Sequence, residues 1–167
     1  MQKNLRDELG KISSTGGLMD VQKVLDLARK NQSTLAFFEK GDIGLNCLGY
    51  ALNISPIGEW VPDSEFVERM ITKKLLREYQ QGSIILYFKN PGSNGTLEHG
   101  GIVDEDCVIS KWGNGHVWKH QLFDVPSQYG DHTVRYRIVD TRIVQEEFSR
   151  YANELDRNRS CFKKISC

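Results

Sequence analysis

The first half of the chain carries apolar residues at helical spacing. In residues 18–30 they recur every three or four positions with lysine and aspartate between them, which predicts an amphipathic helix. Asn31 and Gln32 are expected to end it. A second helix is expected to begin at residues 62–64, where a proline and an aspartate precede a new apolar stripe. The polar residues 1–17, which end in a Ser/Thr/Gly run, are expected to form a flexible lead-in.

A short helix is predicted between these two, beginning at Cys47. Asn46 follows the loop 41–45 and is a good N-cap, because its side chain can accept a backbone N–H of the first turn. Residues 53–56, which end in proline, are expected to terminate this helix soon after it begins.

From Gly82 onward the pattern becomes that of strands. Residues 84–88 form a continuous apolar run, and the loop 90–95 that follows is rich in asparagine, proline and glycine. Residues 100–103 and 107–112 are predicted to pair as a hairpin around an acidic turn. Further along, the pattern predicts two more strands and a charged terminal helix: residues 116–120, 133–139 and 141–156.

Helices first and strands afterwards predict an α+β fold. The length of 167 residues suits one domain with its own core, and no linker or internal repeat divides it. We therefore expect a single domain over residues 1–167, in which residues 141–167 form a C-terminal helix and tail.

The charge balance excludes several classes of partner. The chain has 22 lysines and arginines and 22 aspartates and glutamates, so no net basic field is available to attract nucleic acid or anionic lipid. No apolar stretch approaches the roughly 18 residues of a membrane span, and the N-terminus lacks the apolar run of a signal peptide. We expect a cytoplasmic protein, or one exported without a cleaved leader, that binds neither nucleic acid nor membrane.

Four cysteines are present, without any Cys-x-x-Cys pair: Cys47, Cys107, Cys161 and Cys167. Cys161 and Cys167 could close a small loop, although reduced thiols are the expectation for a chain without a leader.

His116 and His120 have the spacing of two zinc ligands on a helix. The apolar residues between them, after a Gly-Asn-Gly turn, favour a strand instead. In a strand the two imidazoles would stand about 13 Å apart, too far for one ion. We expect no metal ion or organic cofactor.

One thiol and one imidazole are the strongest candidates for chemistry. Cys47 lies at an expected helix start, and His99 directly precedes the expected strand 100–103. A helix N-terminus and a nearby imidazolium both lower the pKa of a thiol, which makes it a better nucleophile at neutral pH. We therefore expect Cys47 to be the most reactive of the four thiols and to lie within hydrogen-bonding reach of His99, or a small rotation away from it. The alternative for both residues is a packing role in the core.

The order of these segments resembles the NlpC/P60 branch of the papain superfamily of cysteine peptidases and amidases. Residues 46–49, Asn-Cys-Leu-Gly, resemble that family's Asp-Cys-Ser-Gly, and residues 99–103, His-Gly-Gly-Ile-Val, resemble its histidine strand. The first segment is also similar to the related CHAP amidases. The resemblance covers about residues 43–120, and its departures, at Asn46 and Leu48, flank the nucleophile.

The resemblance implies a papain-like α+β fold, in which the helix that carries the nucleophile packs against an antiparallel sheet. It implies that Cys47 is the nucleophile and His99 the general base, with the backbone N–H of Cys47 helping to hold the oxyanion. Asn46 and Gly100 are expected to border the substrate. Gly100 would let a substrate backbone come close, and it would equally let its strand pack tightly against the Cys47 helix.

A third residue should accept the other N–H of His99 and fix its tautomer. The resemblance implies a polar residue on the strand paired with the histidine strand, here residues 107–112. A turn of two or four residues places Ser110 diagonally across from His99 on the same face. A three-residue turn places Ile109 and Lys111 there instead, and lysine cannot accept a hydrogen bond. Ser110 is therefore the first candidate. The fallbacks lie on the following turn: Asn114 and His116.

The expected activity is hydrolysis of an amide bond by a Cys–His pair through an acyl-enzyme. The resemblance makes a peptidoglycan stem peptide the leading substrate, followed by another peptide or isopeptide. Without a leader, a wall-active enzyme would be a toxin effector delivered by a dedicated secretion system, with an immunity protein as its partner. The alternatives are acyl transfer by the same fold and a non-catalytic binding module with a degenerate triad.

Overall fold

The computed structural model describes residues 2–13, 19–42, 44–90, 95–113 and 115–165. Within them the chain is a mixed α+β protein whose seven strands form one antiparallel sheet. The strands are β1 (Ala36–Glu39), β2 (Leu76–Glu78), β3 (Ile84–Lys89), β4 (Thr96–Asp104), β5 (Cys107–Lys111), β6 (Val117–His120) and β7 (His132–Ile138). Their order across the sheet is β1-β6-β5-β4-β3-β7-β2.

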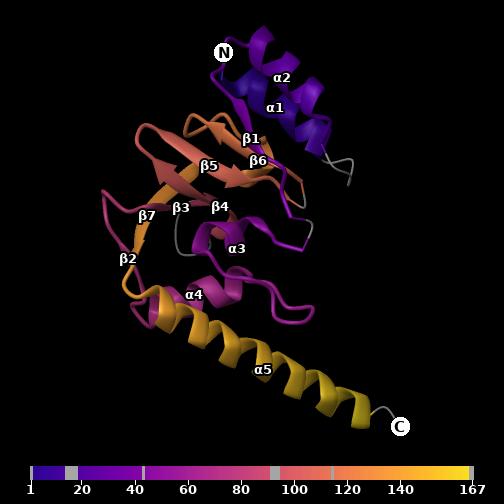
Figure 1. Cartoon of the computed structure of the whole chain (residues 1–167), viewed down its shortest axis with the longest axis vertical. Helices are drawn as coiled ribbons and strands as arrows, with labels where there is room; N and C mark the ends of the chain where they lie inside the picture. The colour runs from indigo at the N-terminus through magenta and orange to yellow at the C-terminus, as the bar shows by residue number, and fades with distance from the viewer. Residues whose placement is uncertain (1, 14–18, 43, 91–94, 114, 166–167) are drawn as a thin grey trace.

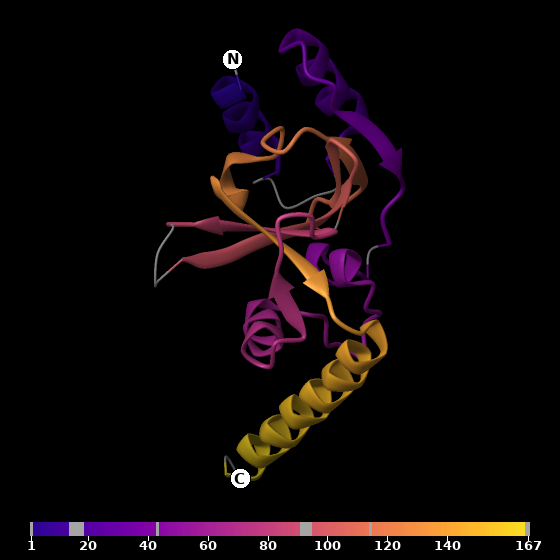
Figure 2. The same cartoon turned by 90° about the vertical axis from the view of Figure 1, so that its left-hand side faces the viewer.

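Helices lie on both sides of this sheet (Figure 1, Figure 2). They are α1 (Gln2–Ser13), α2 (Val21–Lys30), α3 (Cys47–Leu52), α4 (Ser64–Thr72), the 3-10 turn η1 (Ser127–Tyr129) and α5 (Thr141–Ile165). Successive residues of β3 alternate between two apolar cores. Leu86 packs in the core that α3, α4 and α5 complete, whereas Ile85 and Tyr87 pack in the core that α1 and α2 complete. The sheet therefore separates two layers of helices.

The N-terminal segment forms helix α1, so the prediction of a flexible lead-in is wrong here. Leu5 and Leu9 are 2% and 0% exposed and pack in the core shared with α2. Together with Ile12 they follow helical spacing, which the polar composition of the segment concealed. Residues 14–17 of the predicted lead-in lie outside the described residues.

The three helices predicted in the first half are present, with polar caps. α2 begins after Asp20, whose carboxylate accepts two backbone N–H groups of the first turn, and it ends at Asn31 as predicted. α4 begins after Asp63, whose side chain accepts the N–H of Phe66. α3 ends at Asn53, which adopts a left-handed conformation with φ of 53°. Capping residues are thus the most informative local signal in this half of the sequence.

The strands of the second half follow the predicted pattern. β4 and β5 form the expected hairpin, and its turn has two residues because Asp104 pairs with Cys107. His120 ends the strand β6, so it does not share a helix face with His116. Two short edge strands, β1 and β2, were not predicted. They have four and three residues, too few for a recognisable alternation.

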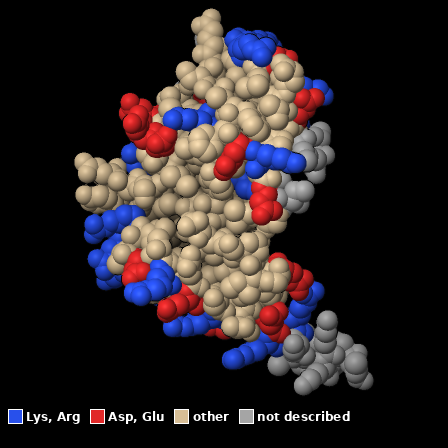
Figure 3. Space-filling view, in the orientation of Figure 1, with Lys and Arg blue, Asp and Glu red and all other residues tan. Residues whose placement is uncertain are grey.

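Helix α5 extends away from the sheet towards its C-terminal end (Figure 1). Its first half packs on α4, where the rings of Phe66 and Phe148 meet edge to face at 5.1 Å. Acidic and basic side chains are intermingled on the surface of this part of the molecule (Figure 3). Glu147 accepts a hydrogen bond from Lys73 at 2.5 Å. Among the described helices, α5 included, none is long and apolar enough to cross a membrane.

The packing of α1 predicts that it contributes to stability. Leu9→Ala should lower the free energy of unfolding by about 3 kcal/mol, because it leaves a cavity at a fully buried site. Asn4→Ala, at an exposed position of the same helix, should change it by less than about 0.5 kcal/mol. Urea unfolding of the full chain measures both. Equal stability of the two variants would show that α1 does not pack on the sheet.

Candidate active site around Cys47

Cys47 is the first residue of α3, and Asn46 fixes this helix start. The Asn46 side chain accepts the N–H of Gly49 at 2.8 Å and donates its own amide N–H to the Pro62 carbonyl at 2.6 Å. The predicted N-cap is therefore present. The Asn46 side-chain amide thus uses its oxygen and its nitrogen in hydrogen bonds to the backbone. A contact between Asn46 and a substrate remains a prediction.

Cys47 lies where β4 and β5 stop pairing with each other. The ladder between these strands runs from Ile102 opposite Ile109 to Asp104 opposite Cys107, while β5 continues along β6 and β4 continues along β3. Helix α3 contacts both β4 and β5. The thiol is thus close to the backbone of β4 at Gly100, the residue after His99. The His99 side chain lies on the opposite face of the sheet, beside Tyr87.

Gly100 allows α3 to lie directly on β4. A Cβ atom at this position would stand 3.0 Å from Leu48 Cδ2 and 3.4 Å from the Ala51 Cβ. The tight packing of the strand against the Cys47 helix is therefore the observed role of this glycine. Its approach to a substrate backbone stays a prediction.

The backbone N–H groups of Gly100, Leu48 and Cys47 itself favour the thiolate and so act to lower the pKa of the Cys47 thiol. Burial has the larger effect, and it raises the pKa of the Cys47 thiol above its ordinary value. The expected lowering of this pKa is therefore wrong, because desolvation outweighs the amides at the helix start. The predicted ranking of Cys47 among the four thiols remains untested.

His99 is 0% exposed and lies between two tyrosine rings. The Tyr129 ring stacks on it with a centroid distance of 4.0 Å and an interplanar angle of 6°, and the Tyr87 ring is tilted against it at 5.4 Å. Burial lowers the pKa of His99 well below 6.5, and the charge of His120 lowers it further. The imidazole is consequently neutral at neutral pH.

Neither ring nitrogen of His99 has a hydrogen-bond partner among the described residues. The expected Cys47–His99 hydrogen bond is therefore not formed in this state. Buried polar atoms are nearly always paired, and an unpaired one calls for an explanation in terms of function or of a missing partner. Ring contacts therefore hold His99, and neither ring nitrogen forms a hydrogen bond with the described residues.

Ser110 does not orient His99, although the two-residue turn places it on the predicted face. Its hydroxyl lies 2.8 Å from Nε2 of His120 and accepts the indole N–H of Trp112 at 3.1 Å. The other ring nitrogen of His120 donates to the Gln121 carbonyl, so Nε2 is the acceptor and the Ser110 hydroxyl donates to it. The prediction considered only the strand on one side of β5. The neighbour on the other side, β6, supplies the partner.

The two fallback residues do not supply a partner either. Asn114 lies outside the described residues. His116 packs edge to face against Phe37 at 5.5 Å, and its buried Nδ1 has no hydrogen-bond partner in the described part of the chain.

Two residues near the thiol were not predicted as members of the site. Lys111 is 1% exposed, and its ammonium donates to the carbonyls of Gly115 and Gly113 at 2.7 and 3.3 Å. Burial lowers the pKa of Lys111, whereas the charge of Asp42 and, to a smaller extent, a thiolate at Cys47 act in the opposite direction. Burial raises the pKa of Tyr129, and a thiolate at Cys47 would raise it further. A lysine ending an apolar strand was the only available signal for the first, and nothing local marked the second.

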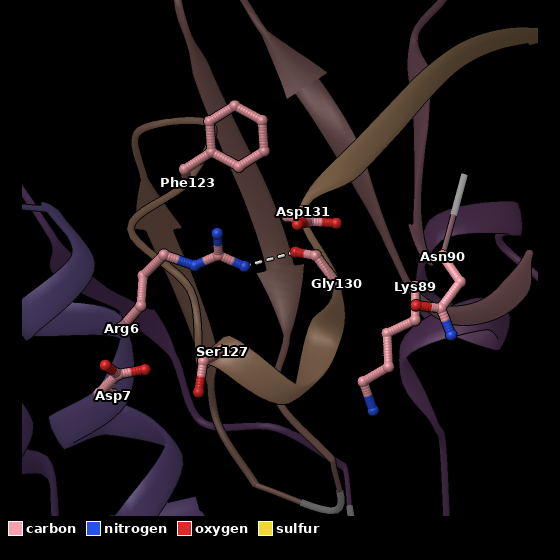
Figure 4. A pocket seen from close by; sticks show the side chains of 8 residues that line it. All are labelled: Arg6, Asp7, Lys89, Asn90, Phe123, Ser127, Gly130 and Asp131. Atoms are coloured by element: carbon pink, nitrogen blue, oxygen red, sulfur yellow. Dashed lines mark hydrogen bonds between the residues drawn. The ribbon is translucent and has the colours of Figure 1, made fainter.

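One cavity lies apart from Cys47 and His99. It has a volume of about 550 Å³ and lies between α1, the end of β3 and the segment around η1 (Figure 4). Arg6, Asp7, Lys89 and Asp131 give it charges of both signs. It borders the chain on either side of Tyr129, through Ser127 and Gly130, without containing the thiol.

In comparisons with known proteins, no family model, no curated protein and no solved structure matches this chain. The resemblance to NlpC/P60 proteins therefore rests on the two short motifs around Cys47 and His99.

The buried His120 predicts that acid destabilises the fold. Burial lowers the pKa of His120 to about 4, whereas in the unfolded chain it is about 6.5. Between these values the unfolded state binds more protons, so stability falls as pH decreases, by about 1.4 kcal/mol per pH unit. His99 contributes with the same sign.

Urea unfolding at pH 7 and pH 5 measures this effect. His120→Gln should lose clearly less stability on acidification than the wild type, whereas His132→Gln, at an exposed position, should lose as much as the wild type. Equal pH dependence of His120→Gln and the wild type would contradict a neutral buried His120.

Proposed function

We propose that the protein is a cysteine hydrolase that cleaves an amide bond with Cys47 and His99. The observations that carry this proposal are a half-buried cysteine whose thiol lies near the backbone N–H of Gly100, the residue after His99, and a buried His99 whose ring nitrogens have no hydrogen-bond partner among the described residues. A histidine kept in the core without any hydrogen bond costs stability. A catalytic role would account for a histidine at this buried position despite that loss of stability.

The proposed reaction begins from a neutral thiol and a neutral imidazole. The sulfur of Cys47 attacks the carbonyl carbon while one nitrogen of His99 takes the thiol proton. The negative charge on the carbonyl oxygen is stabilised by backbone N–H groups at the start of α3. When the C–N bond breaks, His99 returns the proton to the leaving amine. Water, deprotonated by His99, then attacks the thioester, which releases the acid and restores the thiol.

This sequence requires a Cys47–His99 contact that the free protein lacks. Catalytic hydrogen bonds are often long or poorly aligned before the substrate binds, and they tighten in the complex. The unpaired nitrogens of His99 leave it free to form this contact. The low pKa of His99 keeps the imidazole in its basic form at neutral pH.

The proposed substrate class follows from the resemblance to NlpC/P60 proteins. A peptidoglycan stem peptide is the first candidate, and another peptide or isopeptide is the second. On the first proposal the protein acts as a delivered antibacterial effector, with an immunity protein in the producing cell. Acyl transfer differs only in the last step, where an amine or hydroxyl replaces water.

A non-catalytic binding module is the second candidate function, and two observations favour it. Burial raises the pKa of Cys47, and His99 has no exposed surface through which it could reach a substrate. In this alternative both residues belong to the core. The unpaired nitrogens of His99 then lower the stability of the fold and serve no catalytic purpose.

The catalytic proposal predicts that Cys47→Ala abolishes activity, by about 10³-fold or more, because removing the nucleophile leaves only binding. His99→Gln should lose nearly as much. The matched control is Cys107→Ala, which removes the other half-buried free thiol and should retain wild-type activity. The measurement is release of cleaved peptides from purified muropeptides, with unfolding curves for each variant.

Expression in a bacterial host separates the substrate classes. Lysis that requires an added export leader and Cys47 would support a wall substrate, whereas Cys47-dependent toxicity in the cytosol would indicate another amide. Identical behaviour of wild type and Cys47→Ala in both compartments and on muropeptides would contradict the enzyme and leave the binding module.

A further inference from the structure

The orientation of the His99 ring is fixed without a hydrogen bond. In Cys–His–third-residue sites the third residue normally holds the imidazole by accepting its N–H. Here the Ser110 hydroxyl is committed to His120, and both nitrogens of His99 are unpaired. The contact that remains is the ring of Tyr129, almost parallel to the imidazole at 4.0 Å and 6°.

Tyr129 is itself held at both ends. The backbone of Gly113 acts to lower the pKa of the Tyr129 hydroxyl, and the Tyr129 backbone N–H donates to the Pro126 carbonyl at 3.0 Å. The next residue, Gly130, has a φ of 94°, and a Cβ there would stand 2.3 Å from the Phe88 carbonyl oxygen. This position therefore needs glycine.

Helix α1 secures the same segment from outside. The guanidinium of Arg6 donates to the carbonyl of Gly130 (Figure 4). Gly10 of α1 also lies close to Ser127, at the other end of the 3-10 turn. The residues on both sides of Tyr129 thus contact neighbouring elements, and these contacts hold the Tyr129 ring in a fixed orientation against His99.

We propose that Tyr129 is the positioning residue of His99, in the role for which the sequence suggested Ser110. The inference rests on the proposed function, since it concerns the same Cys47–His99 pair. Rotation of the imidazole about its Cβ–Cγ bond would drive a ring edge into the Tyr129 face, so the stack fixes the ring plane. Both nitrogens lie on the ring edge, so the stack itself does not occupy them.

The stack also favours the charged intermediate. When His99 takes the thiol proton it becomes an imidazolium, and the π face of a tyrosine attracts a cation placed over it, most strongly where water is excluded. Tyr87 adds a second ring beside the imidazole. A hydrogen-bonding third residue is then unnecessary.

The test measures the rate at which iodoacetamide alkylates Cys47 between pH 5 and pH 10, with the labelled peptides resolved by mass spectrometry. A thiol that passes its proton to an imidazole reacts at pH values below its own pKa. We expect His99→Gln to lower the Cys47 rate at pH 7 by about 10-fold or more, with little change above pH 9.5. Cys107 in the same chain serves as the internal control.

Three variants at position 129 separate positioning from packing. Tyr129→Leu and Tyr129→Met, which lack a ring, should reproduce the loss seen in His99→Gln at pH 7. Tyr129→Phe, which keeps the ring, should stay within about 3-fold of the wild type. Unfolding curves are recorded in parallel, because lost packing alone lowers stability without removing the neutral-pH rate.

The outcomes test the Cys47–His99 pair and the role of Tyr129 separately. An unchanged Cys47 rate in His99→Gln would overturn the pair itself, and the inference with it. A normal His99→Gln loss with wild-type rates in the leucine and methionine variants would overturn the role of Tyr129 alone. Should those variants not fold, the His99 ring protons of the wild type decide the question. Stacking predicts a strong upfield shift in their NMR signals, and ordinary shifts would contradict it.

Discussion

The close contact between α3 and Gly100 is the constraint on which the arrangement of the site depends. Because Gly100 has no side chain, Leu48 and Ala51 lie directly on β4, and the first residue of the helix is carried to the backbone beside His99. The same contact helps to bury the thiol. A Cβ atom at Gly100 would crowd the Leu48 side chain at 3.0 Å, so this neighbour would have to shift by a few tenths of an ångström.

Burial then sets the protonation states. It raises the pKa of Cys47 and lowers that of His99, so both groups are neutral. The amide N–H groups around the sulfur and the charge of Lys111 oppose this effect without reversing it. Such a pair differs from a preformed thiolate–imidazolium pair, because the proton moves during the attack and not before it. Stability and reactivity are linked here. The same burial that keeps both groups neutral also lowers the stability of the fold, because the unpaired nitrogens of His99 are removed from water.

The sequence predicted most of the elements that position the site. Asn46 and Asp63 are short polar residues before apolar stripes, and such local signals survive in the fold because capping satisfies backbone N–H groups within one turn. Helix α1 was missed because its three apolar residues stand among polar ones. The edge strands β1 and β2 were missed because pairing with a neighbour, and not their own pattern, makes them strands.

The partner of His99 could not be predicted for a different reason. The register of one hairpin places Ser110 correctly on its face, but the choice between His99 and His120 depends on a third strand. Tyr129 comes from a turn thirty residues beyond His99 in the sequence, and no spacing rule connects the two. Contacts of this kind are set by the tertiary fold, so local patterns do not reveal them.

The central claim is that the Cys47 thiol and the His99 imidazole interact, so that the imidazole can take the thiol proton. The most direct measurement is the ¹⁵N NMR titration of the His99 ring in the wild type, in Cys47→Ala and in protein whose Cys47 is capped as an S-methyl disulfide. The account predicts a neutral His99 at pH 6.5 and a ring-nitrogen shift that changes in both altered proteins, while His120 stays unchanged. Identical His99 signals in all three would contradict it.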